Sequence, residues 1–488
     1  MNDNIIRLSP AIVWKNFYKL TQIPRPSKKE GQVIRFMEQF GKSLGLETIK
    51  DDVGNIVIRK PATQGMENKK GIILQAHLDM VPQKNSDKVH DFEKDPIETL
   101  VDGEWVRANK TTLGADNGIG AASIMSVLES KDIAHGPVEA LFTIDEETGM
   151  TGAFALKQGM LKGDILLNTD SEDEGELYIG CAGGVDAVIG FKYTPVPVAG
   201  NYIAYNLIVK GLKGGHSGLD INLERANSNL VLTRILWRST FKFKTRLASL
   251  NGGDLRNAIP REAVAVLLVP SDKDQEFKDF VEGHVTILKA EYHTTEPEMN
   301  IYLEKVPVPD TLIDEETQNK LISAIYTCPN GVIRMSADIE GLVETSANLA
   351  IVKTGKDIIS ISCLLRSSVD SAKDDLSSRI RALFELAGAE VNFSGSYPGW
   401  KPDPDSTILT VMKEVYNRKF GKIPEVKAIH AGLECGIIGG IFPNLDMISF
   451  GPTIRSPHSP DERVKIDTVQ KFWDFLVETL KNAPEKVK

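Results

Sequence analysis

The chain has 488 residues, of which 41% are hydrophobic and 25% are charged, a composition typical of globular proteins. At about 150 residues per domain, this length predicts roughly three compact units. The formal net charge of -10 argues against nucleic acid as a partner, because a nucleic-acid-binding face needs a surplus of Lys and Arg. A small molecule is therefore the expected binding partner.

The N-terminal segment and the cysteines indicate the cellular compartment. Residues 1–10 mix Asn, Asp and Arg with apolar residues, and so contain neither the core of a signal peptide nor a membrane-spanning segment. We therefore expect a cytoplasmic protein with no membrane partner. The four cysteines lie far apart in the sequence, which argues against both disulfides and a cysteine zinc site.

Predicted helices and short apolar strands alternate in the first part of the chain. A helix is expected over residues 28–44, because apolar residues recur at helical spacing between Ser27 as a cap and Gly45 as a stop. Another helical stretch covers residues 121–130. Three apolar runs predict strands at residues 71–76, 138–144 and 164–168. This alternation predicts an α/β fold with a mostly parallel central sheet covered by helices.

The pattern changes after residue 186 to alternating strands, such as residues 204–209 and 263–269, with helices near residues 227–237 and 372–387. The first pattern returns near the C-terminus, with a strand at residues 447–450 and an amphipathic helix over residues 466–480. The sequence therefore predicts one α/β domain formed by residues 1–186 and 401–488, interrupted by an inserted α+β domain of residues 187–400. The insert is long enough for two related α+β units, although no residue-level repeat shows a duplication.

Histidines and carboxylates follow the predicted strands of the α/β domain, where open sheets bind their ligands. They are His77 and Asp79, then Asp145, Glu146 and Glu147, then Asp170, and finally His458 after the last strand. Asp116 lies in a glycine-rich loop, residues 113–120, that leads into a helix. Two histidines and three carboxylates, one of them bridging, suit two metal ions and favour zinc over calcium or magnesium.

Each of these motifs also has an ordinary structural interpretation. A His-x-Asp pair at a strand end is more often structural, and an Asp-Glu-Glu run is usually a solvated turn. The glycine-rich loop resembles a phosphate-binding loop but lacks the Lys-Ser/Thr of a P-loop, which argues against nucleotide binding. The acidic residues Glu172, Asp173, Glu174 and Glu176 are expected to be solvated. The joint occurrence of the motifs in this order is what favours a metal site.

The ordered set resembles the aminoacylase and carboxypeptidase group of co-catalytic zinc peptidases over nearly the whole chain. The matching motifs are His77-x-Asp79, Gly114-Ala-Asp-Asn-Gly118, Asp145-Glu-Glu-Thr-Gly149, Asp170, Gly214-Gly-His-Ser-Gly218 and His458. Within that group, residues 75–82, 168–171 and 430–436, together with the long insert, are similar to the bacterial aminoacyl-histidine dipeptidases. These are cytosolic enzymes of the carnosinase type.

The resemblance implies a centre of two zinc ions, with manganese or cobalt as substitutes. One ion would be held by His77, Asp116 and Asp170, and the other by Asp116, Glu147 and His458. Glu146 would be the general base that takes the proton of a shared water molecule. Asp79 would orient the His77 ring, a surface salt bridge being its alternative role. The family also implies a cis peptide bond between Asp116 and Asn117.

The inserted domain would be a lid that supplies substrate contacts. His216 resembles the lid histidine that stabilises the oxyanion of the reaction, and a buried structural histidine is the alternative. Arg366 and Asn257 match positions that would bind the free carboxylate and the backbone of a short peptide, for which the forked guanidinium of Arg is well suited. Glu434 would either meet the free amine of the substrate or cap a helix.

These inferences together predict a cytosolic dizinc peptidase that hydrolyses Xaa-His dipeptides. A tripeptidase or an N-acyl amino acid deacylase with the same metal centre is the alternative, because fold and metal site do not determine the substrate. A metal- or peptide-binding protein without turnover is disfavoured, since both Glu146 and Asp79 are present. The sequence leaves the oligomeric state open, with a homodimer as one option.

Overall fold

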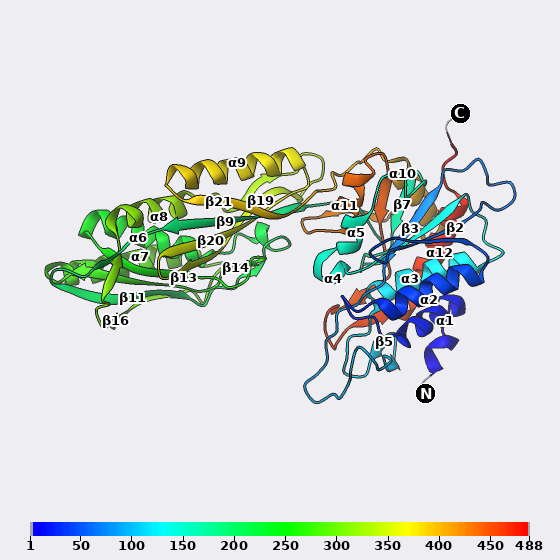
Figure 1. Ribbon diagram of the computed structural model, residues 1–488, viewed down its shortest axis with the longest axis horizontal. Coiled ribbons are helices and arrows are strands. Elements are labelled where there is room, and N and C mark those ends of the chain that lie inside the picture. The colour runs from blue at the N-terminus through cyan, green and yellow to red at the C-terminus, as the bar shows by residue number, and fades with distance from the viewer. Residues whose placement is uncertain (1–2, 487–488) are drawn as a thin grey trace. The chain divides into compact units, whose positions relative to one another are not determined.

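The structure is a computed structural model that describes residues 3–486, and the chain divides into two compact units (Figure 1). The first unit comprises the residues up to Gly180, Trp400–Ala428, and the residues from Leu433 onward. The second unit comprises Cys181–Gly399 and Ile429–Gly432. The domain boundaries inferred from the sequence, near residues 186 and 400, remain predictions.

The first unit is built on an eight-stranded sheet. In spatial order its strands are β1 (Glu47–Lys50), β2 (Ile56–Lys60), β6 (Val138–Thr143), β3 (Ile72–His77), β7 (Ile165–Asn168), β23 (Asp446–Ser449), β8 (Glu176–Cys181) and β22 (Glu425–Ile429). A smaller sheet contains β24 (Ile454–Arg455), β25 (Arg463–Lys465), β5 (Trp105–Ala108) and β4 (Thr99–Asp102).

The central strands β6, β3, β7 and β23 are parallel, as the sequence predicts. Every residue of β3, β6 and β7 is buried, which means that both faces of the sheet are covered. Because these strands are parallel and adjacent, their carboxyl ends meet at one edge of the sheet. The prediction of an α/β fold with a mostly parallel central sheet is confirmed.

Helices surround this sheet (Figure 1). They are α1 (Ala11–Thr21), α2 (Gly31–Ser43), α3 (Ala115–Glu129), α4 (Glu146–Gly149), α5 (Thr151–Ala155), α10 (Thr407–Phe420), α11 (Glu434–Ile441) and α12 (Ile466–Lys481), preceded by a 3-10 helix at Asp3–Arg7. The predicted helix over residues 28–44 begins at Gly31 instead. The helix expected over residues 121–130 begins at Ala115, with non-helical backbone angles at Asp116 and Asn117.

The second unit is built on a nine-stranded sheet. In spatial order its strands are β16 (Asn300–Val306), β11 (Tyr202–Lys210), β15 (Ala263–Pro270), β13 (Arg246–Gly252), β19 (Val343–Thr354), β20 (Ile358–Ser367), β9 (Gly183–Lys192) and β21 (Glu390–Tyr397), with β18 (Gly331–Met335) paired to β19. Two short pairs accompany it: β10 (Pro195–Pro197) with β17 (Thr311–Ile313), and β12 (Gly215–His216) with β14 (Ala258–Ile259).

Buried and accessible residues alternate along β15 and along much of β9, which is typical of an antiparallel sheet with one packed face. The helices of this unit are α6 (Ser228–Phe243), α7 (Asp274–Glu291), α8 (Glu315–Thr327) and α9 (Asp370–Leu386), with 3-10 turns at Ile221–Leu223 and Ser271–Lys273. Buried residues of all four helices share one hydrophobic core with the sheet. Within residues 3–486, every helix falls short of the length and apolar character that crossing a bilayer requires.

Candidate metal centre

The carboxyl edge of the central sheet gathers the histidine and carboxylates singled out in the sequence. His77 is the last residue of β3, and Asp170 follows β7 by two residues. Glu146 and Glu147 begin α4, directly after β6 and the turn at Asp145. The pairing of Gln75 with Asn168 and of His77 with Thr143 brings these strand ends into line. Strand geometry alone therefore places these side chains together.

The carboxylate of Asp116 faces a different histidine with each of its oxygens. Its Oδ1 lies 3.1 Å from His77 Nε2, and its Oδ2 lies 3.2 Å from His458 Nε2. Asp170 Oδ1 lies 3.2 Å from His77 Nε2, and Glu147 Oε2 lies 2.9 Å from His458 Nε2. Two groups of three ligands thus share one carboxylate.

These two groups, His77 with Asp116 and Asp170, and Asp116 with Glu147 and His458, each have ligand atoms within 4.8 Å of one another. Ligand atoms of a tetrahedral zinc ion, each ~2.0–2.1 Å from the metal, lie ~3.3 Å from one another. The distances between the side chains fit that spacing. In addition, Asp170 Oδ1 is buried without a hydrogen-bond donor. The residues present therefore fit a pair of metal ions bridged by Asp116.

The electrostatics of the site also favour a bound cation. Burial, only partly opposed by His77, raises the pKa of Asp170 to about 7, and burial raises the pKa of Glu146 well above its ordinary value. Hydrogen bonds to Asp116 and Glu147 raise the pKa of His458 to about 11. A divalent ion would allow the carboxylates to be ionised and both imidazoles to be neutral.

Another group of three buried carboxylates, Glu30, Asp79 and Asp145, lies nearby. Glu30 Oε1 accepts hydrogen bonds from the backbone N–H groups of Lys28 and Asp145, and the Asp145 carboxylate accepts from the hydroxyls of Thr148 and Thr151. Local donors therefore account for this group, and we do not count it among the metal ligands.

Asp79 connects His77 to the helix that carries the other carboxylates. Its Oδ1 lies 3.3 Å from His77 Nδ1 and accepts the backbone N–H of Glu146 at 3.0 Å. Its Oδ2 accepts from Ser27 Oγ at 2.8 Å and from the backbone N–H of Glu147 at 3.2 Å. Although burial opposes it, the hydrogen bond and charge of His77 lower the pKa of Asp79 to about 2. This geometry suits a carboxylate that orients the imidazole.

The second unit contains three further predicted residues, His216, Asn257 and Arg366, whereas Glu434 lies in the first unit. His216 Nδ1 accepts the backbone N–H groups of Gly218 at 3.2 Å and Leu219 at 3.0 Å. The ring hydrogen must then reside on Nε2, which is free to donate. Burial and the nearby positive charge of Arg366 lower the pKa of His216, which favours this neutral form.

Arg366 is 6% exposed, and its Nη1 donates to the hydroxyl of Tyr397 at 3.0 Å, while its Nε is buried without an acceptor. Near it, His430 Nε2 lies 2.7 Å from Ser346 Oγ. Asn257 is exposed, and its backbone carbonyl accepts the N–H of Ser217. The second unit thus holds a guanidinium with unused donor capacity.

The sequence and fold of the chain can be compared with those of known proteins. Residues 73–482 match the profile of Peptidase family M20/M25/M40. The chain belongs to this family. A cytosol non-specific dipeptidase of Escherichia coli (strain K12) is 47% identical over 484 residues, which are 99% of this chain and 100% of that relative.

Solved structures agree with membership of family M20/M25/M40. The crystal structure of an aminoacylhistidine dipeptidase from Vibrio alginolyticus is 49% identical, covers 99% of both chains and superposes with a TM-score of 0.95. Aminopeptidase PepT from Bacillus cereus ATCC 10987 is 16% identical, with 98% of this chain and 99% of that chain covered and a TM-score of 0.62. At that identity the second comparison shows a common fold only. The cis peptide bond between Asp116 and Asn117 that the resemblance implies is also present.

Several residues at this candidate site were given no role from the sequence. Gln75 and Asn168 lie beneath the candidate ligands: Gln75 Nε2 donates to the predicted site residue Glu434 (Oε2) at 2.6 Å, Thr143 Oγ1 donates to the same oxygen at 2.7 Å, and Asn168 Nδ2 donates to Gln75 Oε1 at 2.5 Å. Polar residues inside otherwise apolar strands are the signal that could have identified Gln75 and Asn168. Arg25 and Glu462 were also missed, and no motif in the sequence marks them.

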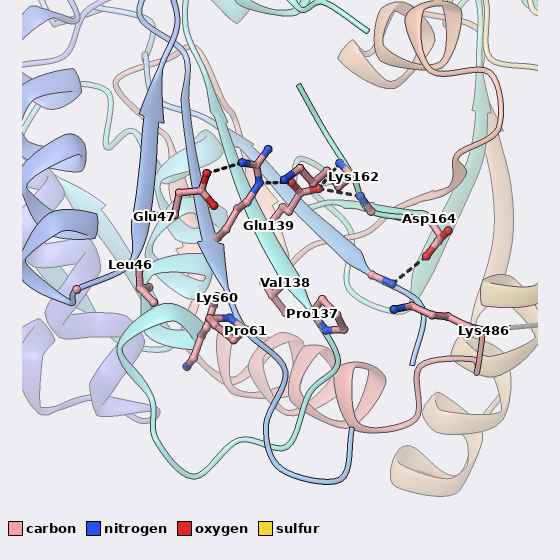
Figure 2. Close-up of a pocket in the computed structure, with 14 residues that line it drawn as sticks. Leu46, Glu47, Lys60, Pro61, Pro137, Val138, Glu139, Lys162, Asp164 and Lys486 are labelled. Carbon is pink, nitrogen blue, oxygen red and sulfur yellow. Dashed lines mark hydrogen bonds and ion pairs between the residues drawn. The ribbon is translucent and has the colours of Figure 1, made fainter. Parts of the chain in front are cut away.

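A separate cavity of about 460 Å³ lies at the opposite end of the parallel strands (Figure 2). Its wall includes Gly71 and Val138, which lie where β3 and β6 begin. Three of its charged groups form ion pairs with one another, because Arg59 donates to Glu47 at 2.9 Å and to Glu139 at 2.7 Å. This cavity is therefore distinct from the candidate metal centre at the carboxyl ends of the strands.

Proposed function

We propose that this chain is a two-zinc dipeptidase that hydrolyses short peptides, with Xaa-His dipeptides as preferred substrates. The observation that carries the proposal is the carboxylate of Asp116, whose two oxygens face two separate ligand groups at 3.1 Å and 3.2 Å. The names of the similar proteins support the peptide substrate, since one is a cytosol non-specific dipeptidase and another an aminoacylhistidine dipeptidase. A cytosolic location is part of the same proposal.

The proposed ligands are His77, Asp116 and Asp170 for one ion, and Asp116, Glu147 and His458 for the other. Zinc suits these imidazole and carboxylate donors, and manganese or cobalt are substitutes with overlapping preferences. When bound, such a pair of ions polarises a carbonyl group and lowers the pKa of water.

Glu146 is the proposed general base, which removes the proton of the attacking water and delivers it to the leaving amine. Its backbone N–H is held by Asp79 at 3.0 Å, so the residue that orients His77 also positions the start of the helix that carries Glu146. Asp79 acts as a positioning residue in this scheme.

His216, Arg366 and Asn257 are proposed to bind the substrate. The Nε2–H of His216 donates to the oxygen on which negative charge develops, because Nδ1 already accepts two backbone N–H groups. Arg366 pairs with the free carboxylate of a dipeptide, and Asn257 contacts the peptide backbone. Glu434 is the proposed partner of the free amine.

A substrate panel tests this function. The chelated protein is reloaded with defined zinc, manganese or cobalt and offered Xaa-His dipeptides, other dipeptides, tripeptides, dipeptide amides and N-acetyl amino acids. We expect metal-dependent cleavage of dipeptides, led by Xaa-His and including β-alanyl-histidine. Faster cleavage of tripeptides or N-acetyl amino acids would favour the tripeptidase or deacylase instead. Uniform rates on all dipeptides would show that the enzyme has no preference for histidine. The oligomeric state, including a homodimer, can be measured on the same samples.

A further inference from the structure

Glu462 makes an unusual set of contacts beside the candidate metal centre. Its Oε2 accepts the backbone N–H groups of Leu113 at 2.7 Å and Gly114 at 2.9 Å. Its Oε1 accepts those of Ala115 at 2.7 Å and Asp116 at 3.2 Å. One buried carboxylate, 2% exposed, therefore binds four consecutive N–H groups, the last of which belongs to the bridging residue.

Arg25 binds the carbonyl groups of the same region. Its Nη1 donates to the backbone oxygens of Leu78 at 2.9 Å and Asp79 at 3.0 Å, and its Nη2 donates to that of Gly114 at 2.5 Å. The side chain is 2% exposed. Arg25 thus ties the backbone just after His77 to the loop that carries Asp116, and Glu462 binds the N–H groups of that loop.

The sequence position of Glu462 adds a third connection. It lies four residues after His458 on the loop between β24 and β25, so its carboxylate joins that loop to the backbone at Asp116. A helix that needed only a cap could use a local Ser, Thr or Asp, yet Gly114 at the start of α3 provides no side-chain cap. The distant carboxylate instead links two loops that each carry a metal ligand.

We propose that Glu462, supported by Arg25, is a positioning residue that holds Asp116 and His458 in register for metal binding. This inference rests on the proposed metal centre and extends it to residues that touch neither ion nor substrate. Partners that orient metal ligands typically change metal affinity by ~10–100-fold when they are replaced. In this proposal, one buried side chain sets the relative position of the loop that carries Asp116 and the loop that carries His458.

Glu462→Gln is the decisive variant, because it keeps the shape while turning an NH₂ group toward two of the four N–H donors. We expect its affinity for zinc to fall by ~10–100-fold in competition with a chromogenic chelator. The visible absorption spectrum of the cobalt-loaded protein should change as well, because the ligands around the metal move. Asp461→Asn is the matched control, since it removes the same charge from an exposed neighbour on the same loop, and it should retain native affinity.

The melting temperature of the chelated proteins separates positioning from a purely structural role. If Glu462→Gln lowers only the melting temperature and keeps native zinc affinity and a native cobalt spectrum, the inference is wrong. Should that variant fail to fold, Glu462→Asp decides, because its shorter carboxylate reaches fewer N–H groups and should weaken zinc binding, whereas native affinity would overturn the inference. Native protein that binds two ions but cleaves no dipeptide would reject the proposed function and leave this result standing.

Discussion

Glu434→Gln offers a test whose size can be worked out from the structure. Glu434 is fully buried, and burial, partly opposed by His77 and Thr143, raises its pKa from 4.5 to about 7. The folded chain then holds this proton at pH values where the unfolded chain has released it, so the carboxyl group reduces stability as the pH rises from 4.5 to 7. Above pH 7 the full effect is reached, and the ionised carboxylate lowers the free energy of unfolding by about 3 kcal/mol for a pKa shift of this size.

Gln resembles the protonated acid in shape and carries no charge, so the substitution should remove this cost. We expect the chelated variant to be more stable than the native chain by about 3 kcal/mol at pH 8.5 and by less than about 1 kcal/mol at pH 5. For a unit of this size, the gain at pH 8.5 corresponds to a rise in melting temperature of roughly 5–10 °C. Glu414→Gln, at an exposed position of α10, is the control and should change neither value.

Thermal melting of the chelated proteins at the two pH values measures this difference. A lower melting temperature at pH 8.5, or an equal gain at both pH values, would refute the reasoning. The same variant tests the contact between Glu434 and the free amine of the substrate. If that contact exists, the metal-loaded variant should show a higher KM for dipeptides with unchanged metal content, and a native KM would remove Glu434 from the substrate-binding residues.

Three further predictions concern catalysis. Glu146→Gln should keep native metal content while kcat falls by ~100-fold or more, which is the usual effect of losing a general base. Near-native turnover with normal metal content would show that Glu146 is not the general base. His216→Ala should lower kcat by an amount equivalent to ~3 kcal/mol with a smaller change in KM, because an oxyanion donor acts mainly in the transition state. Steady-state kinetics on one dipeptide measures kcat and KM separately, and a change confined to KM would contradict the role of His216 as an oxyanion donor. Arg366→Ala should raise the KM of dipeptides about tenfold or more but leave that of dipeptide amides unaffected, so equal losses on both substrates would argue against a carboxylate contact.

Much of the candidate metal centre could be predicted because it follows from strand direction. His77 and Asp170 follow adjacent parallel strands, so recognising the apolar runs was enough to place them at one edge. Asp116 and His458 are different, since no strand ends at either. The sequence placed both in loops and counted them among the candidate ligands, the resemblance to a family assigned them to particular ions, and their distances to the other residues came from the structure.

Arg25 and Glu462 could not be predicted for a physical reason. Their partners are backbone N–H and carbonyl groups of residues far away in the sequence, and every residue type offers the same backbone groups. Side-chain motifs therefore carry no trace of these contacts. The start of α3 was predicted at the wrong residue for the same reason. The backbone N–H groups at the start of a helix ordinarily need a nearby capping side chain, but here they donate to the distant carboxylate of Glu462.

The buried polar residues beneath the site show how local departures from a strand pattern mark function. An apolar residue would suit the buried positions of Gln75 and Asn168 better by strand propensity and burial alone. Instead, Gln75 bonds to Asn168 and Glu434, and Ser449 Oγ bonds to Asn168 Oδ1 at 2.5 Å, so hydrogen bonds cross-link β3, β7 and β23 near the carboxyl edge of the sheet. Such a network is stable only when its members are satisfied together, which makes the relative positions of the strand ends rigid. Ligands that must stay within a few tenths of an ångström of a metal geometry gain from that rigidity, and this accounts for polar residues at positions where packing alone would favour apolar ones.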